Sequence, residues 1–188
     1  MNRSTSDAGI IRDHGMFRLI LTAMSHPGSV LAVPELDGEP EALALLLSPL
    51  MDQESTFAVI GDRLLSERLQ RSTFARPVDV GEADFIIAPQ GSTEGMMTRF
   101  RRGTLEYPDR SATLVYRVDS LGYGDLSLTL TGPGVDGQTE LEIGGMDMDE
   151  FRQLQAVNMD FPLGLDALFL DRAGRIAAMA RSTRTEGV

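Results

Sequence analysis

The residues of this chain best suited to bind an anion lie close to its carboxyl end. Arg181 and Arg184 flank two hydroxyl side chains, Ser182 and Thr183. Guanidinium groups form paired, charge-assisted hydrogen bonds with phosphate or carboxylate oxygens, and hydroxyls can donate to the same oxygens. Arg18, near the amino end, is a candidate to join them. The segment predicts an anion-binding site, and the alternative is a solvated tail that carries charge.

A second candidate is the adjacent pair Ser25 and His26. A hydroxyl beside an imidazole suggests a nucleophile and its base, but adjacent residues rarely bring these groups within reach. The G-x-S-x-G motif of the α/β-hydrolases is also absent. The other histidine is His14, so a metal site would have to rely on carboxylates, and we predict none. His26 is therefore either a surface or capping residue or a general acid–base group.

Two kinds of covalent chemistry are closed to this chain, because all 17 of its basic residues are arginine and it has no cysteine. Without a lysine amine, no Schiff base to pyridoxal phosphate or to a carbonyl substrate can form. Without a thiol, there is no cysteine nucleophile and no thiolate-bound metal. We predict no cofactor, and the composition favours binding or assembly over bond making.

The stretch from Gly132 to Gly137 matches G-x-G-x-x-G, the phosphate-binding pattern of dinucleotide sites. That pattern requires a helix directly after it, whose amide groups meet the pyrophosphate. Residues 138–143 instead have the composition of a strand. We therefore interpret these glycines as a hairpin turn and predict no dinucleotide site.

The elements that must position these groups alternate between helix and strand in the first half of the chain. Apolar residues at positions 17, 20, 21 and 24 have helical spacing, and this helix should end at Pro27-Gly28. Further helices are predicted over residues 40–50, 63–71 and 147–159, with an irregular segment over residues 91–109. Strands are predicted over residues 29–33, 56–60, 84–88, 112–118, 125–131 and 138–143, with a hairpin over residues 167–179. The mixture predicts one three-layer α/β domain over residues 1–188 with a mixed sheet, flexible at residues 1–8 and 185–188.

The charge balance limits the classes of partner. With 28 acidic and 17 basic residues the net charge is −11, which disfavours nucleic acid and anionic membranes. No apolar run approaches the ~20 residues of a membrane span. The opening residues lack the apolar core of a signal peptide. We expect a cytoplasmic protein that binds neither nucleic acid nor membrane.

Three segments together resemble one protein family. Residues 17–28 contain Phe-Arg followed by Ala-Met-Ser-His-Pro-Gly, and residues 130–134 read Leu-Thr-Gly-Pro-Gly. Residues 161–166 read Phe-Pro-Leu-Gly-Leu-Asp, ahead of the closing hairpin and Arg181-Ser-Thr. In this order and spacing they are similar to the H subunit of the bacterial carbon–phosphorus lyase system, which degrades phosphonates. The chain departs from that family at Ala180, where a proline is usual, and at residues 182–184, Ser-Thr-Arg, where Thr-Thr is the commoner pattern.

The resemblance implies a fold, a set of partners and a role. The fold would be that of the pyridoxal-phosphate-dependent transferases without the cofactor, and the chain alone would form a homodimer. With the G, I and J subunits it would form a core complex and support transfer of the ribose triphosphate of ATP to methylphosphonate, with release of adenine. The alternative is a free-standing homodimeric enzyme acting on a small phosphorylated metabolite. The resemblance supplies no catalytic residue. Motif position and charge assign ligand or partner binding to Arg18, Ser25, His26, Arg181, Ser182, Thr183 and Arg184.

Overall fold

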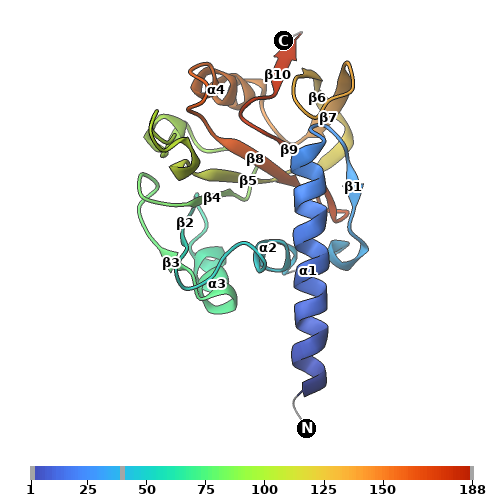
Figure 1. Ribbon diagram of the computed structural model, residues 1–188, viewed down its shortest axis with the longest axis vertical. Helices are drawn as coiled ribbons and strands as arrows, with labels where there is room; N and C mark the ends of the chain where they lie inside the picture. The colour runs from blue at the N-terminus through green and yellow to red at the C-terminus, as the bar shows by residue number, and fades with distance from the viewer. Residues whose placement is uncertain (1–2, 39–40, 187–188) are drawn as a thin grey trace.

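A seven-stranded mixed sheet forms the centre of the computed structural model, which describes residues 3–38 and 41–186 (Figure 1). Its strands are β1 (Leu31–Ala32), β2 (Thr56–Val59), β3 (Arg76–Pro77), β4 (Phe85–Ala88), β5 (Thr113–Arg117), β8 (Asp166–Leu170) and β9 (Arg175–Met179). The spatial order is β1-β9-β8-β5-β4-β2-β3. The neighbours from β8 to β3 pair in parallel, whereas β9 pairs antiparallel with both β8 and β1. The predicted α/β fold with a mixed sheet is confirmed.

A smaller antiparallel sheet has the order β10-β6-β7. It consists of β6 (Ser120–Thr131), β7 (Thr139–Gly144) and β10 (Arg184–Glu186). Residues 132–138 join β6 to β7, so the hairpin interpretation of the glycine-rich stretch is confirmed. The sequence did not predict β10, and residues 185–186, expected to be flexible, pair with β6. Residues 187–188 lie outside the described residues.

The described residues form four α-helices around the large sheet: α1 (Arg3–Ser25), α2 (Ala42–Leu47), α3 (Arg63–Thr73) and α4 (Met148–Asn158). Short 3-10 helices span Pro34–Leu36, Met97–Arg99 and Pro108–Arg110. Helix α1 ends just before Pro27 as predicted, but it already begins at Arg3, so most of the segment expected to be flexible is helical. Helix α2 ends before the predicted residue 50, because Pro49 has no N–H to extend it. Residue 40, its predicted start, lies outside the described residues. Within the described residues no helix is both long and apolar enough to cross a membrane.

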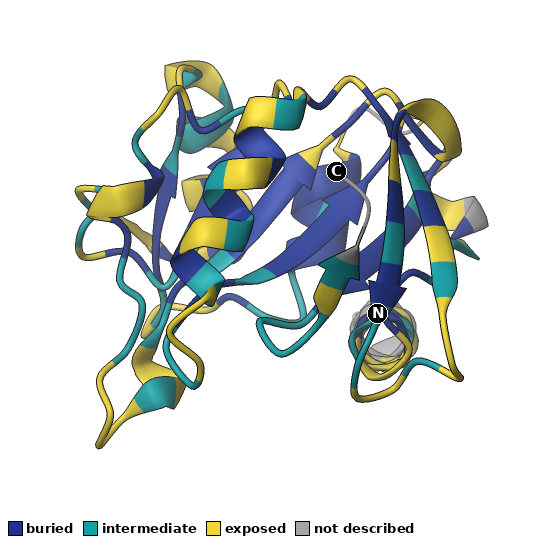
Figure 2. Cartoon of the chain, turned by 90° about the horizontal axis from the view of Figure 1, so that it is seen from above, coloured by how far each residue is buried: buried dark blue, intermediate teal, exposed yellow. Residues whose placement is uncertain are grey.

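Between its edge strands β1 and β3, the large sheet is buried on both faces (Figure 2). Successive side chains of a strand point to opposite faces, so neighbouring residues of β5 enter different cores. Leu114 and Tyr116 pack with α4 and the small sheet. Val115 packs with α1, α2 and α3. The sheet therefore lies between a layer of three helices and a second layer made of α4 and the small sheet.

Candidate functional site

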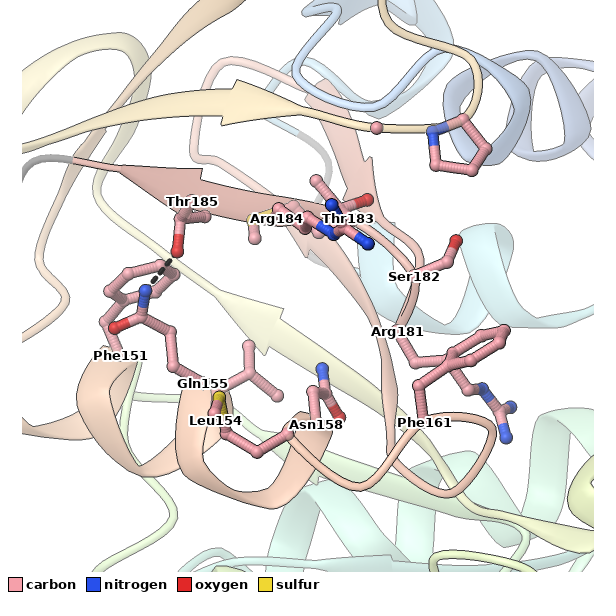
Figure 3. Close-up of a pocket in the computed structure, with 14 residues that line it drawn as sticks. Phe151, Leu154, Gln155, Asn158, Phe161, Arg181, Ser182, Thr183, Arg184 and Thr185 are labelled. Atoms are coloured by element: carbon pink, nitrogen blue, oxygen red, sulfur yellow. Dashed lines mark hydrogen bonds between the residues drawn. The ribbon is translucent and has the colours of Figure 1, made fainter. Parts of the chain in front are cut away.

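A cavity of about 780 Å³ lies between α4 and the segment that follows β9; we call it the carboxyl-terminal cavity (Figure 3). Figure 3 shows α4 forming one wall and residues 181–185 the other. Its lining residues are Gly132, Pro133, Phe151, Leu154, Gln155, Asn158, Met159, Phe161, Met179, Arg181, Ser182, Thr183, Arg184 and Thr185. The four carboxyl-terminal residues that the sequence predicted to bind a ligand or partner therefore line one cavity.

The motifs that carried the family resemblance pack against one another around this cavity. A β-carbon added to Gly134 would overlap the carbonyl oxygen of Ser25, and one added to Gly132 would lie 3.2 Å from the carbonyl oxygen of Ser182. A β-carbon added to Gly164 would overlap the side-chain amide of Asn158. Glycine at these positions allows the backbone to approach closely at positive φ. The loops at residues 25–28, 132–134 and 161–166 thus fix where the carboxyl-terminal segment runs.

Arg181 is held by the protein itself. Its guanidinium donates to both carboxylate oxygens of Asp166, at the start of β8, and to the carbonyl oxygen of Pro108 at 2.6 Å. The backbone N–H of Arg181 donates to the same carboxylate at 2.8 Å. Asp166 thus neutralises the charge of Arg181. In this arrangement Arg181 anchors the segment, and each of its three guanidinium nitrogens already has an acceptor.

Arg184 differs from Arg181 in exposure and pairing. It is exposed, and within the described residues its side chain makes no hydrogen bond or ion pair. In Figure 3 the guanidinium groups of the two arginines lie well apart. The buried hydroxyl of Thr183 also lacks a partner in the described part of the chain. Arg184 therefore supplies the uncompensated positive charge of the cavity, and Thr183 supplies an unused hydroxyl.

The remaining predicted residues lie at the carboxyl-terminal half of α1. Arg18, Ser25 and His26 are exposed and do not line the cavity. The imidazole Nδ1 of His26 lies 3.1 Å from the carbonyl oxygen of Thr22, as expected for a residue that caps a helix end. The carbonyl oxygen of Ser25 lies close to Gly134, and Ser25 is not among the residues that line the cavity. Their proposed part in binding stays a prediction.

Helix α4 carries a buried carboxylate that the sequence did not reveal. The predicted start of α4 at Asp147 is confirmed, since its side chain accepts from the N–H of Asp149. Glu150 lies in the first turn of this helix, and its side chain enters the core. It accepts from the hydroxyl of Tyr116 at 2.6 Å, and from the N–H and hydroxyl of Thr93 at 3.0 and 2.8 Å. No local spacing could reveal this, because the partners lie 34 and 57 positions away.

Two ionisable groups near the ends of the parallel strands are perturbed. Burial raises the pKa of the Tyr116 phenol well above its usual 10, and the neighbouring Glu150 carboxylate raises it further. At the amino end of β4, burial raises the pKa of Asp84, but hydrogen bonds from Thr56 and the charge of Arg101 outweigh it. The pKa of Asp84 is therefore lowered overall. Both groups hold loops in place and lie outside the lining of the cavity.

Chemically, the carboxyl-terminal cavity is equipped to bind. It offers one free guanidinium, an unused hydroxyl and apolar side chains at its rim. Among the described residues no three His, Cys, Asp or Glu side chains are grouped so as to hold a metal ion. The geometry assigns no reacting group among these described lining residues.

Comparison with known proteins gives a consistent family. The model of the family described as bacterial phosphonate metabolism protein (PhnH) matches residues 9–186. A protein of Stutzerimonas stutzeri named putative C-P lyase subunit protein HtxG is 36% identical over 172 residues, which cover 92% of this chain and 85% of the relative. Alpha-D-ribose 1-methylphosphonate 5-triphosphate synthase subunit PhnH of Rhizobium meliloti (strain 1021) is 34% identical over 106 residues, which cover 56% of this chain and 52% of the relative. The predicted resemblance is confirmed, and the chain belongs to the PhnH family of bacterial phosphonate metabolism proteins.

Proposed function

We propose that this protein is a subunit of the carbon–phosphorus lyase core complex in the cytoplasm, where it joins the G, I and J subunits. In that complex it supports transfer of the ribose triphosphate of ATP to methylphosphonate, with release of adenine. The names of the two relatives support this role, since one is a putative C-P lyase subunit and the other a subunit of the corresponding synthase. Alone, the chain forms a homodimer. Its fold is a pyridoxal-phosphate transferase fold without the cofactor, in keeping with the absence of lysine from the sequence.

The observation that carries the docking role is the rim of the carboxyl-terminal cavity. Met159 and Phe161, just after α4, are 81% and 64% exposed, and both line the cavity. Large apolar side chains gathered at a concave site are typical of a protein–protein interface. Arg184, exposed and unpaired within the described residues, adds a positive charge beside them. The cavity therefore suits a partner segment that brings one apolar anchor and one carboxylate.

Within this role the predicted site residues divide by task. Arg184, Ser182 and Thr183 contact the incoming partner, because they line the cavity and Arg184 has no internal acceptor. Arg181 positions the segment through Asp166. The protein contributes binding and orientation to the complex, and the reacting groups come from its partners.

Size-exclusion chromatography with light scattering tests the proposal, on the chain alone and after co-expression with the G, I and J subunits. We expect a homodimer alone and one stoichiometric complex with the partners. Arg184→Ala together with Phe161→Ser should weaken or abolish co-elution, whereas the control Arg63→Ala, on exposed α3, should not. A homodimer that ignores the partners would overturn the proposal and favour a free-standing enzyme.

A further inference from the structure

A second hollow, of about 450 Å³, lies at the opposite ends of the sheet strands from the carboxyl-terminal cavity. We call it the carboxyl-edge cavity, because its lining residues follow the carboxyl ends of parallel strands. Pro89 and Gln90 follow β4, Arg117 ends β5, and Arg172 lies just after β8. The carboxyl-terminal cavity instead adjoins Asp166, where β8 begins. In open α/β sheets, ligands bind at the carboxyl ends of the strands.

The carboxyl-edge cavity contains a free positive charge. Arg117 is exposed, and within the described residues its side chain makes no hydrogen bond or ion pair. Arg172 forms an ion pair with Asp119 at 2.5 Å, and both of these side chains are more than half exposed. An ion pair so accessible to water is worth little in stability, so Arg172 can exchange its partner at small cost. In a chain of net charge −11, this pair of arginines creates a local positive site.

The backbone that presents these side chains is rigidly held. The buried carboxylate of Asp171 accepts from the N–H groups of Leu121, Ala173 and Arg175, at 3.0, 2.9 and 2.8 Å. These bonds fix the β8–β9 turn that carries Arg172. Beside it, the N–H of Asp119 donates to the carbonyl oxygen of Gly144 at 2.8 Å. Arg117, the last residue of β5, and Arg172, in the β8–β9 turn, thus line one hollow from neighbouring strands. Arg117 also lines a smaller hollow beside Glu41 and Arg68.

We propose that the carboxyl-edge cavity binds a phosphate or phosphonate group through Arg117 and Arg172, with the side-chain amide of Gln90 as a further donor. Two guanidinium groups, one at the end of a strand and one on a neighbouring turn, can donate to different oxygens of a tetrahedral phosphorus oxyanion. The site suits a dianion, because Arg172 then exchanges the Asp119 carboxylate for the ligand while Arg117 supplies the second charge. The proposal does not depend on the docking role of the carboxyl-terminal cavity.

Removing the Asp119 carboxylate provides a test in which the affinity for the anion should rise, not fall. This carboxylate competes with the ligand for Arg172 and repels an anion in the same hollow. Removing its charge should therefore strengthen binding, whereas removing the charge of Arg117 should weaken it. If anions bound only through the overall charge of the surface, replacing Arg117 and replacing a distant arginine would lower the affinity alike.

We would titrate the full chain with inorganic phosphate, methylphosphonate and acetate at low ionic strength and follow backbone amide shifts by NMR. Phosphate and methylphosphonate should shift the amides of Gln90, Asp119 and Gly145, with acetate at least tenfold weaker. Arg117→Gln should weaken phosphate binding about tenfold or more, the loss of one charge-assisted bidentate contact. Asp119→Asn should tighten it. The control Arg152→Gln, an exposed arginine of α4 outside both cavities, should bind like the parent.

Three results would overturn the proposal. In the first, Arg117→Gln and Arg152→Gln bind phosphate alike. In the second, phosphate shifts amides of the carboxyl-terminal cavity and responds to Arg184→Gln instead. In the third, none of the probes binds. Because Arg117 is exposed, its variant should keep the parent melting temperature, which shows that lost binding is not lost folding. Co-elution with the G, I and J subunits is measured separately, so either proposal can fail alone.

Discussion

Replacing Arg181 by leucine separates an anchoring arginine from a binding one. The substitution removes the guanidinium bonds to Asp166 and to the carbonyl oxygen of Pro108, and leaves the Asp166 carboxylate with the N–H of residue 181. Breaking a fully buried pair costs about 3–5 kcal/mol. The two side chains here are 15% and 21% exposed, so water can partly solvate the stranded carboxylate. We expect a loss of about 2–3 kcal/mol in the free energy of unfolding, or roughly 4–12 °C in melting temperature.

Urea and thermal unfolding of the purified chain measure this loss, with Arg184→Leu as the matched control. Arg184 is exposed and unpaired within the described residues, so its variant should stay within about 0.5 kcal/mol of the parent. In the double variant Asp166→Asn, Arg181→Leu the stranded charge is gone, and its cost should be smaller than the sum of the single variants. If Arg181→Leu and Arg184→Leu unfold together, the anchoring role is wrong.

Three further predictions concern the interior and the loops. Glu150→Gln should lower the free energy of urea unfolding by about 2–4 kcal/mol, because an amide cannot accept at both former oxygens and leaves a buried donor unpaired. The control Asp149→Asn, at its exposed neighbour, should lower it by less than about 1 kcal/mol. Equal losses would contradict this account. Gly134→Ala should melt well below Gly137→Ala, since both residues have positive φ but only Gly134 has no space for a β-carbon; similar melting temperatures would refute the close loop packing. Because the pKa of Tyr116 is raised in the folded state, its contribution to stability is fully present below pH ~10 and is lost as the pH rises further, by up to about 1.4 kcal/mol per pH unit. In urea unfolding between pH 9 and 11, Tyr116→Phe should lack this decline, and parallel curves for parent and variant would disprove the coupling.

The sequence by itself determined the elements whose signals are local. Pro27 marks the end of α1, and Asp62 and Asp147 mark the starts of α3 and α4, where each carboxylate accepts a backbone N–H of the first turn. Short apolar runs identified β2, β4 and β5, because strands buried on both faces must be apolar throughout. The sequence also predicted correctly that Gly132–Gly137 forms a turn, since no helical pattern follows it. Each of these signals lies within a few residues of the feature that it specifies.

Only the tertiary structure decided which charges are free and which are held. Arg181 and Arg184 look equivalent in the sequence. Asp166 neutralises Arg181, whereas Arg184 has no ion-pair partner among the described residues and is free to bind a ligand or partner. The sequence also does not show the partners of Glu150, which come from distant loops. Arg117 lines the same cavity as Arg172 only because β5 and β8 are neighbours in the sheet. The physical reason is that an ion pair or a cavity depends on the register of strands far apart in the chain, whereas composition and spacing report only on the residues beside it.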